Sequence, residues 1–441
     1  MLIKFSVKNF KTFKEKAELS MVASNYDKHR EDDNITYIPE FDLRILKTAV
    51  VYGANASGKS KLMEAFRVMR KLVRTSSKET QKGDPIAIEP FRLNSASENE
   101  PTEFEVIFHH DRQLFRYGFE VDKTRVVSEW LFHKPNTKEV ELFYRDGQKF
   151  TIHSRSFSKG KMLVKEDFVK ENTLMLSAAA QWNDEKAGEV SNWFRSFGVI
   201  SGLKEDGYAA FTLSQTHNPA LKKNYLDFLQ KADLEIQDFT LEKMDVDNLP
   251  KDLPKEVREA IEMKLKDEKK ELVSDVLTSH KKYNVDKAFV ENVNFSLKED
   301  ESSGTRKFFF LSGPILDVLS HGYLLIVDEL DSKLHPNLVC KITAIFNSKE
   351  LNPNNAQLIF NTHDTNLLSS GTFRRDQIWF TEKNRYGEAS LYSLADFKTS
   401  DVRKEDNFEK NYIQGKYGAI PFFGDFQKLL DTNLVLHDNE E

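Results

Sequence analysis

The chain has 441 residues, which is too long for one ordinary hydrophobic core and predicts two or three domains. Hydrophobic residues make up 39% and charged residues 30%, and the formal net charge of −6 argues against a protein that binds nucleic acid over most of its surface. A single cysteine, Cys340, excludes an intramolecular disulfide, as expected for the reducing cytoplasm. The sequence has no apolar leader and no run of about 18 apolar residues, so we expect a cytoplasmic protein without a membrane span.

The first segment is predicted to form a strand pair. Ile3, Phe5 and Val7 alternate with polar residues, which is typical of a half-buried strand, and residues 17–23 are its expected return strand. Residues 24–45 are polar and irregular, so we expect them to form a loop over the phosphate-binding segment that follows.

Residues 53–60 fit the phosphate-binding pattern G-x-x-x-x-G-K-[ST] between an expected strand at 48–52 and an expected helix at 61–75. The predicted phosphate-binding residues are Gly53, Asn55, Ala56, Ser57, Gly58, Lys59 and Ser60. A glycine-rich turn at a helix N-terminus presents several backbone N–H groups to one anion. The lysine would reach the β- and γ-phosphates and the serine hydroxyl would bind Mg²⁺, so a nucleoside triphosphate site is predicted.

The helix after this loop carries Arg67, Arg70, Lys71 and Arg74 largely on one face. A solvated helix surface is the simplest interpretation of these four charges. A contact with DNA or with the phosphates of a partner is the alternative.

The middle of the chain changes its periodicity. Phe104, Val106 and Phe108 begin a period of two that predicts an antiparallel meander over 103–152. Residues 155–300 look mainly helical, with helices expected at 177–197, 218–236 and 254–280. The last of these carries an apolar stripe of Val257, Ile261, Leu265, Leu272 and Val276, which predicts a short helical arm or partner-facing helix.

A continuous apolar strand at 323–327 ends in Asp328 and Glu329. An acid directly after a buried parallel strand emerges at the sheet edge beside the phosphate-binding loop. Asp328 could then hold Mg²⁺, and Glu329 is placed to act as the general base for water. The next strand, 357–361, is followed by His363, whose imidazole could hydrogen-bond the γ-phosphate or the water.

Residues 301–307 precede a helical stretch and include Ser303 and Gly304. Hydroxyls and glycine at a helix N-terminus are most simply an N-cap. In a chain with a phosphate-binding loop, a second anion-binding surface has another interpretation: it completes the site of a neighbouring subunit.

Taken in order, these motifs resemble the ABC-type ATPase head of the SMC, RecF and OLD-like group, in which Asn55 is an expected feature of the first loop. The resemblance implies an α/β P-loop NTPase fold with an antiparallel β-subdomain and an inserted, mainly helical arm. It implies that ATP and Mg²⁺ are bound, that Asp328 is the Mg²⁺-associated acid and Glu329 the catalytic base, and that His363 is the switch histidine. Ser303 and Gly304 then belong to a signature loop that contacts ATP across a dimer.

More narrowly, residues 328–336 and 362–364 resemble a bacterial AAA-family group of abortive-infection and phage-defence operons, of the RloA/AbiL type. The signature departs from the usual L-S-G-G-x-x-Q, because Glu301, Ser303 and Lys307 replace its Leu, first Gly and Gln. His335 stands where many related heads carry aspartate.

We expect four regions: 1–154 as the first half of the head, 155–300 as the inserted arm, 301–430 as the second half and 431–441 as an acidic tail. The leading hypothesis is an ATP-driven switch, a homodimer or higher homo-oligomer that controls a nuclease-like or toxin-like effector in anti-phage defence. A RecF-like ATPase that binds DNA and a non-hydrolysing scaffold with bound ATP are the alternatives. No membrane partner is expected.

Overall fold

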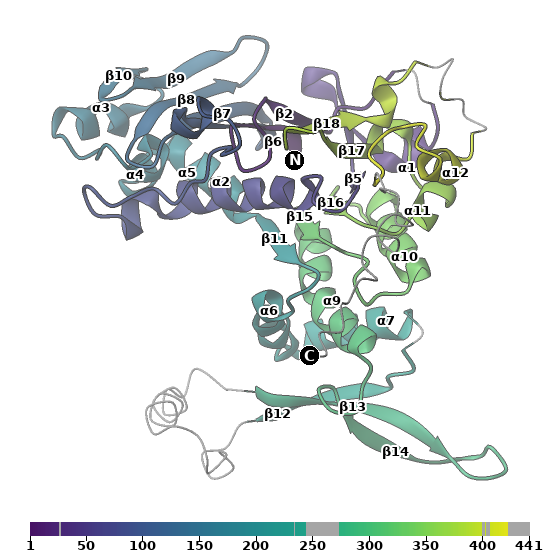
Figure 1. Ribbon diagram of the computed structural model, residues 1–441. Coiled ribbons are helices and arrows are strands. Elements are labelled where there is room, and N and C mark those ends of the chain that lie inside the picture. The colour runs from purple at the N-terminus through teal and green to yellow at the C-terminus, as the bar shows by residue number, and fades with distance from the viewer. Residues whose placement is uncertain (26–27, 233, 244–272, 399–401, 403–405, 422–441) are drawn as a thin grey trace, which may run out of the picture.

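The computed structural model describes residues 1–25, 28–232, 234–243, 273–398, 402 and 406–421. Two larger sheets dominate it, one mostly parallel and one antiparallel, and a three-stranded arm lies at the far end from the antiparallel sheet (Figure 1). The acidic tail predicted at 431–441 lies outside the described residues. In the described part of the chain, no helix has both the length and the apolar character that crossing a membrane requires.

The central sheet has six strands in the order β11-β15-β16-β5-β17-β18. Their bounds are β5 Thr48–Gly53, β11 Phe197–Ser201, β15 Leu324–Asp328, β16 Gln357–Asn361, β17 Ile378–Lys383 and β18 Ala389–Ser393. Every pair is parallel except β17 with β18. The strands predicted at 48–52, 323–327 and 357–361 are confirmed, and the predicted insertion contributes β11 to this sheet.

Helices cover both faces of the central sheet, as expected for an α/β protein. Alternate residues of β5 separate two cores: Ala49 and Val51 pack in the core that contains α2 (Lys59–Glu79), and Val50 and Tyr52 pack in the other. The second core contains α9 (Ser303–His321), α10 (Pro336–Asn347), α11 (Asn366–Ser369) and α12 (Phe408–Ile413). The helix predicted at 61–75 is therefore confirmed and extends further at both ends.

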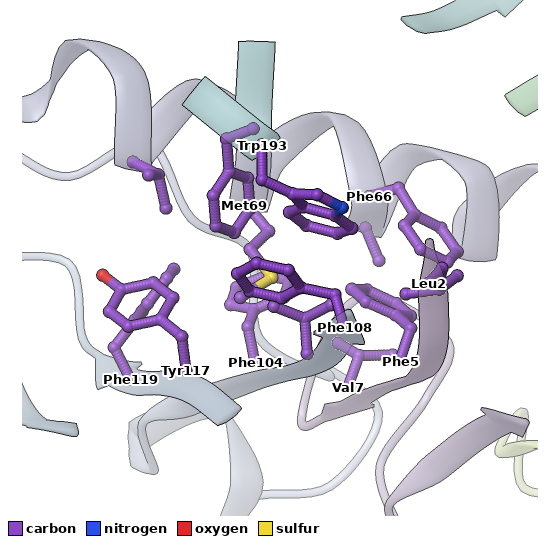
Figure 2. Close-up of a cluster of buried hydrophobic side chains, with 14 of the residues drawn as sticks. Leu2, Phe5, Val7, Phe66, Met69, Phe104, Phe108, Tyr117, Phe119 and Trp193 are labelled. Carbon is purple, nitrogen blue, oxygen red and sulfur yellow. The ribbon is translucent and has the colours of Figure 1, made fainter. Parts of the chain in front are cut away.

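The antiparallel sheet has seven strands in the order β10-β9-β8-β7-β6-β1-β2. Their bounds are β1 Leu2–Lys8, β2 Ala17–Ser20, β6 Thr102–His110, β7 Gln113–Val121, β8 Val126–Lys134, β9 Val140–Asp146 and β10 Lys149–Ile152. The predicted first strand pair and the meander over 103–152 are confirmed. The inward aromatic side chains pack against α2, where Phe5 stacks on Phe66 with ring centroids 3.7 Å apart (Figure 2).

The prediction that the segment 24–45 forms a loop over the phosphate-binding segment is wrong. This segment forms α1 (Glu31–Asn34) and a hairpin of β3 (Ile35–Ile38) and β4 (Leu43–Leu46). Thr36 donates to the side chain of Asn355 at 2.7 Å and Asn34 to that of Gln377 at 2.6 Å, and these acceptors lie just before β16 and β17. The hairpin therefore covers the amino ends of the parallel strands, at the edge opposite the phosphate-binding loop.

The inserted region combines short helices with a β-arm. Its helices are α3 Ser158–Lys165, α4 Met175–Gln181, α5 Glu185–Arg195, α6 Asp206–Thr216 and α7 Pro219–Gln230. Its arm consists of β12 Asp238–Lys243, β13 Val273–Tyr283 and β14 Phe289–Ser296. The helix predicted at 218–236 is confirmed over Pro219–Gln230 and ends earlier than predicted. The helix predicted at 177–197 is two helices, because Asp184 caps a new start.

The prediction of a helix at 254–280 is wrong over residues 273–280. Residues 254–272 lie outside the described part, and residues 273–280 belong to β13. Here Val276 and Thr278 are buried with a period of two, and β13 pairs with strands on both sides. Backbone pairing on two sides fixes this segment as a central strand, although its apolar spacing also fits a helix.

His109 on β6 should make stability depend on pH. Burial lowers its pKa from 6.5 to about 4, and its Nε2 is buried without a hydrogen-bond partner among the described residues. The unfolded chain then binds more protons between pH 6.5 and 4, so the folded state loses stability as the pH falls through this window. Between pH 7 and 5, we expect the free energy of unfolding to fall by about 1–2 kcal/mol more in the wild type than in His109→Phe.

Chemical denaturation at both pH values measures this difference. His153→Gln, at an exposed position, is the control and should follow the wild type. Equal losses in wild type and His109→Phe would contradict the assignment.

Candidate nucleotide site

The carboxyl ends of the parallel strands meet at one edge of the central sheet. Gly53 at the end of β5 pairs with Thr381 on β17, and Asn361 at the end of β16 pairs with Val51. Asp328 ends β15 next to β16. In open α/β sheets, ligands bind at this edge, and the topology brings the phosphate-binding loop and the acidic strand end to it.

The loop 53–60 has the backbone that only glycine adopts easily. Gly53 has φ +153° and Gly58 φ +120°, and Ala56 has φ +60°. A Cβ on Gly53 would lie 2.4 Å from the carbonyl oxygen of Thr381, and one on Gly58 would lie 3.2 Å from the side chains of Thr12 and Ala389. Gly53 therefore allows a close approach that any side chain would block, and Gly58 adopts a positive φ that would strain any other residue.

Lys59 begins α2 and its side chain turns back over the loop. Its Nζ donates to the carbonyl oxygens of Gly53 at 2.6 Å and Ala54 at 3.0 Å, and the residue is 5% exposed. Burial lowers the pKa of Lys59 to about 8, against the nearby charges of Glu329, Asp331 and Asp328. The ammonium is thus pre-positioned at the loop and poorly solvated. A bound phosphate would offset the free-energy cost of this desolvation by accepting charge-assisted hydrogen bonds.

Two of the predicted loop residues differ in their surroundings. The Ser57 hydroxyl lies 2.6 Å from the Thr381 hydroxyl and is buried, which ties the loop to β17. Asn55 is exposed at the loop surface. Thr381 was not found from the sequence, because its link to the loop is a pairing between strands far apart in the chain.

Asn361 holds the acidic strand end in place and is the main residue that the sequence did not reveal. Its Nδ2 donates to Asp328 Oδ1 at 2.6 Å, and its Oδ1 accepts the backbone N–H of Glu329 at 2.5 Å. Asn361 is fully buried. One amide therefore orients the predicted Mg²⁺ ligand and the predicted general base together.

Glu329 has a left-handed backbone, with φ +59°. A non-glycine residue in this region is uncommon and needs surrounding contacts that hold it. The Asn361 contact is one of these, and Gly202 is another: a Cβ there would lie 1.9 Å from the carbonyl oxygen of Glu329. The turn directs the chain away from β15 at the residue predicted to be the base.

His363 follows β16 at the same edge. Its backbone N–H donates to Asp331 Oδ2 at 3.1 Å, and the residue is exposed. Its position therefore depends on the segment that follows β15, and its ring lies where solvent or a ligand can reach it.

Ser303 and Gly304 form the first turn of α9. The N-cap is Ser302, whose Oγ accepts the N–H of Thr305 at 3.0 Å. Ser303 is exposed, whereas a Cβ on Gly304 would lie 2.8 Å from the Lys333 carbonyl oxygen. The first turn of α9 thus packs on the segment after β15. His335, the departure noted in that segment, caps α10 by accepting the N–H of Asn337 at 3.2 Å.

The chemistry of the site fits a magnesium triphosphate. A 21-residue helix begins at a bare glycine turn, which suits an anion. The Ser60 hydroxyl and the Asp328 carboxylate are the oxygen ligands that Mg²⁺ prefers, with the remaining positions left to water and phosphate. Within the described ranges, no group of three or more His, Cys, Asp or Glu side chains is arranged to hold a metal ion by itself.

Arg70, one of the four cations on the helix after the loop, and Lys11, which follows β1, both make internal contacts. Lys11 forms ion pairs with Glu64 at 2.8 Å and Glu89 at 3.2 Å. Arg70 donates to the Phe194 carbonyl at 3.0 Å, and burial lowers its pKa to about 10. Both side chains are therefore engaged in contacts within the fold.

One family of known proteins matches the part of the chain that holds this site. Residues 49–369 match the family described as "AAA domain, putative AbiEii toxin, Type IV TA system". No curated protein matches the chain. Among solved structures, the SMC head domain from Thermotoga maritima is similar over 89% of this chain and 98% of that chain, with 12% sequence identity and a TM-score of 0.39.

Proposed function

The chain belongs to this AAA-domain family of P-loop ATPases, and from that premise we propose that it hydrolyses ATP and acts as a dimeric switch. The observation that carries the proposal is the Asn361 amide, which fixes Asp328 and Glu329 at the sheet edge that also holds the phosphate-binding loop. A purely structural acid pair would not require this shared orientation beside a phosphate site.

Each residue has a distinct part in the proposed reaction. The backbone N–H groups at the start of α2 and the Lys59 ammonium bind the phosphates. Glu329 accepts the proton of the attacking water, and His363 donates a hydrogen bond to the transferred phosphoryl group. Ser60 and Asp328 would hold Mg²⁺, which neutralises charge on the phosphate oxygens.

The dimer is proposed from the first turn of α9. Ser303 is exposed at a capped helix N-terminus, which suits the phosphate of a second copy of the chain. Two copies related by a two-fold axis would each supply a phosphate-binding loop to one site and Ser303 and Gly304 to the other. ATP would then hold the dimer together, and hydrolysis would release it.

An effector partner and a role in anti-phage defence complete the proposal. They are supported by the resemblance to abortive-infection ATPases and by a family description that names a toxin. The β13–β14 hairpin offers a surface for a partner, because Tyr283, Val285 and Phe289 are all more than half exposed at its tip. Copurification from cells with ATP present identifies the partner.

Phosphate release and light-scattering mass, each with Mg-ATP and with Mg-ADP, test the function. We expect turnover, and a doubling of mass with ATP that ADP does not support. Bound nucleotide without turnover would replace the switch with a non-hydrolysing scaffold. Salt-dependent DNA binding that stimulates turnover would favour a RecF-like protein instead.

A further inference from the structure

Lys307 lies one turn into α9, where the usual signature pattern has glutamine. Its side chain is fully buried, although it carries a charge. A buried ammonium is costly unless its donors are satisfied. Its surroundings therefore indicate what the residue does.

The Nζ of Lys307 faces three carbonyl oxygens of one short segment. It lies 2.5 Å from the oxygen of Ser332, 3.0 Å from that of Leu330 and 3.4 Å from that of Glu329. An ammonium has three donors and no acceptor, so its capacity matches these carbonyls. Glutamine has only two amide N–H donors and could not serve all three. All three carbonyls belong to the chain directly after β15, which begins with Glu329 itself.

Further contacts join the same two elements. Gly304 packs its backbone against Lys333, and Glu205 binds both elements, accepting from Arg306 at 2.9 Å and lying 3.6 Å from Lys333 Nζ. The Arg306 and Lys333 partners of Glu205 are partly exposed, whereas the Lys307 side chain is fully buried between the two elements. Lys307 thus lies between the turn that carries Ser303 and Gly304 and the turn that sets the backbone of Glu329.

We propose that Lys307 is a positioning residue that couples the first turn of α9 to the catalytic Glu329. The inference rests on the proposed function, in which that turn meets the nucleotide of a second copy. A shift of α9 on dimerisation is carried through Lys307 to the carbonyls of residues 329–332, and through them to the carboxylate of Glu329. Lys307 touches no substrate and acts only through this backbone.

The test compares Lys307→Met, Lys307→Gln and Lys307→Arg with the wild type. Lys307→Met removes all donors at similar volume, Lys307→Gln introduces the usual signature residue, and Lys307→Arg retains a charged donor. The matched control is Ser312→Ala, which removes a buried side-chain hydrogen bond from the same helix without touching the segment after β15. Readouts are kcat, the KM for ATP, the mass with ATP and the melting temperature.

We expect Lys307→Met to lower kcat by about 10- to 100-fold, because misplacement of a catalytic group by about 1 Å has effects of this size. The KM for ATP and the ATP-dependent mass should stay within about threefold of wild type, since the side chain of Lys307 is directed at the carbonyls of residues 329–332. Lys307→Arg should recover part of kcat, and Ser312→Ala should leave it unchanged.

An unchanged kcat in Lys307→Met, or an equal loss in Ser312→Ala, would overturn the coupling role. If Lys307→Met does not fold, Lys307→Gln decides in its place. It keeps buried donors but has two for three carbonyls, so kcat should still fall, and an unchanged kcat would overturn the coupling role. The wild type distinguishes a failure of the proposed function from a failure of the coupling. If it neither turns over nor associates with ATP, the proposed function fails and the coupling fails with it. If it does both, the variants test only the coupling role of Lys307.

Discussion

Glu329→Gln is expected to lower kcat for ATP hydrolysis by about 10²–10⁴-fold, the range that general-base catalysis contributes. The amide keeps the shape of the side chain but cannot accept the proton of water. The backbone contact with Asn361 and the left-handed turn do not depend on the carboxylate, so the fold and ATP binding should be preserved. The variant should therefore accumulate as an ATP-bound dimer.

Single-turnover hydrolysis and light scattering measure these two effects on one sample. Glu350→Gln, at an exposed position after α10, controls for the loss of a negative charge and should behave as wild type. Turnover within about threefold of wild type would remove Glu329 from the catalytic role.

Lys59→Ala should abolish nucleotide binding at ordinary concentrations. Charge-assisted hydrogen bonds contribute about 1.5–3 kcal/mol each. The loss of contacts with two phosphates therefore predicts about 10²–10⁴-fold weaker binding. The protein without nucleotide should remain as stable as wild type or become more stable, because burial already lowers the pKa of Lys59 to about 8 and disfavours its charge.

The thermal shift caused by Mg-ATP measures this loss directly, since ligand binding raises stability in proportion to the logarithm of ligand concentration over Kd. Lys61→Ala is the matched control, because Lys61 lies in the same first turn of α2 and pairs with Glu64 at 3.1 Å instead of with the phosphate-binding loop. A full thermal shift in Lys59→Ala would show that nucleotide binds elsewhere.

The sequence predicts those parts of the site that are each formed by a short continuous segment. The glycines at 53 and 58, the strand before them and the acids at the end of β15 are local patterns, each with its own physical signature. Asn361, Thr381 and Lys307 act through contacts with segments distant in the chain, and no periodicity marks such contacts. In the sequence, Asn361 is marked only as the last residue of a strand, although its buried amide orients Asp328 and the backbone of Glu329.

In the arm and in the β3–β4 hairpin, local sequence patterns do not determine the secondary structure. The apolar spacing around Val276 fits both a helix and a strand, and the pairing of β13 with two neighbours decides between them. In the hairpin, two four-residue strands are too short to stand out against polar surroundings. Tertiary pairing supplies what local propensity lacks in both segments.

Mixing two inactive variants tests the composite site most directly. Lys59→Ala disables the phosphate-binding loop, and Ser303→Glu should repel the phosphate of a partner while its charge suits the N-terminus of α9. A mixed dimer has one site with both defects and one with neither. Random mixing of equal amounts should therefore restore about a quarter of wild-type ATPase activity. Activity no greater than that of the separate variants would contradict a site shared between two copies of the chain.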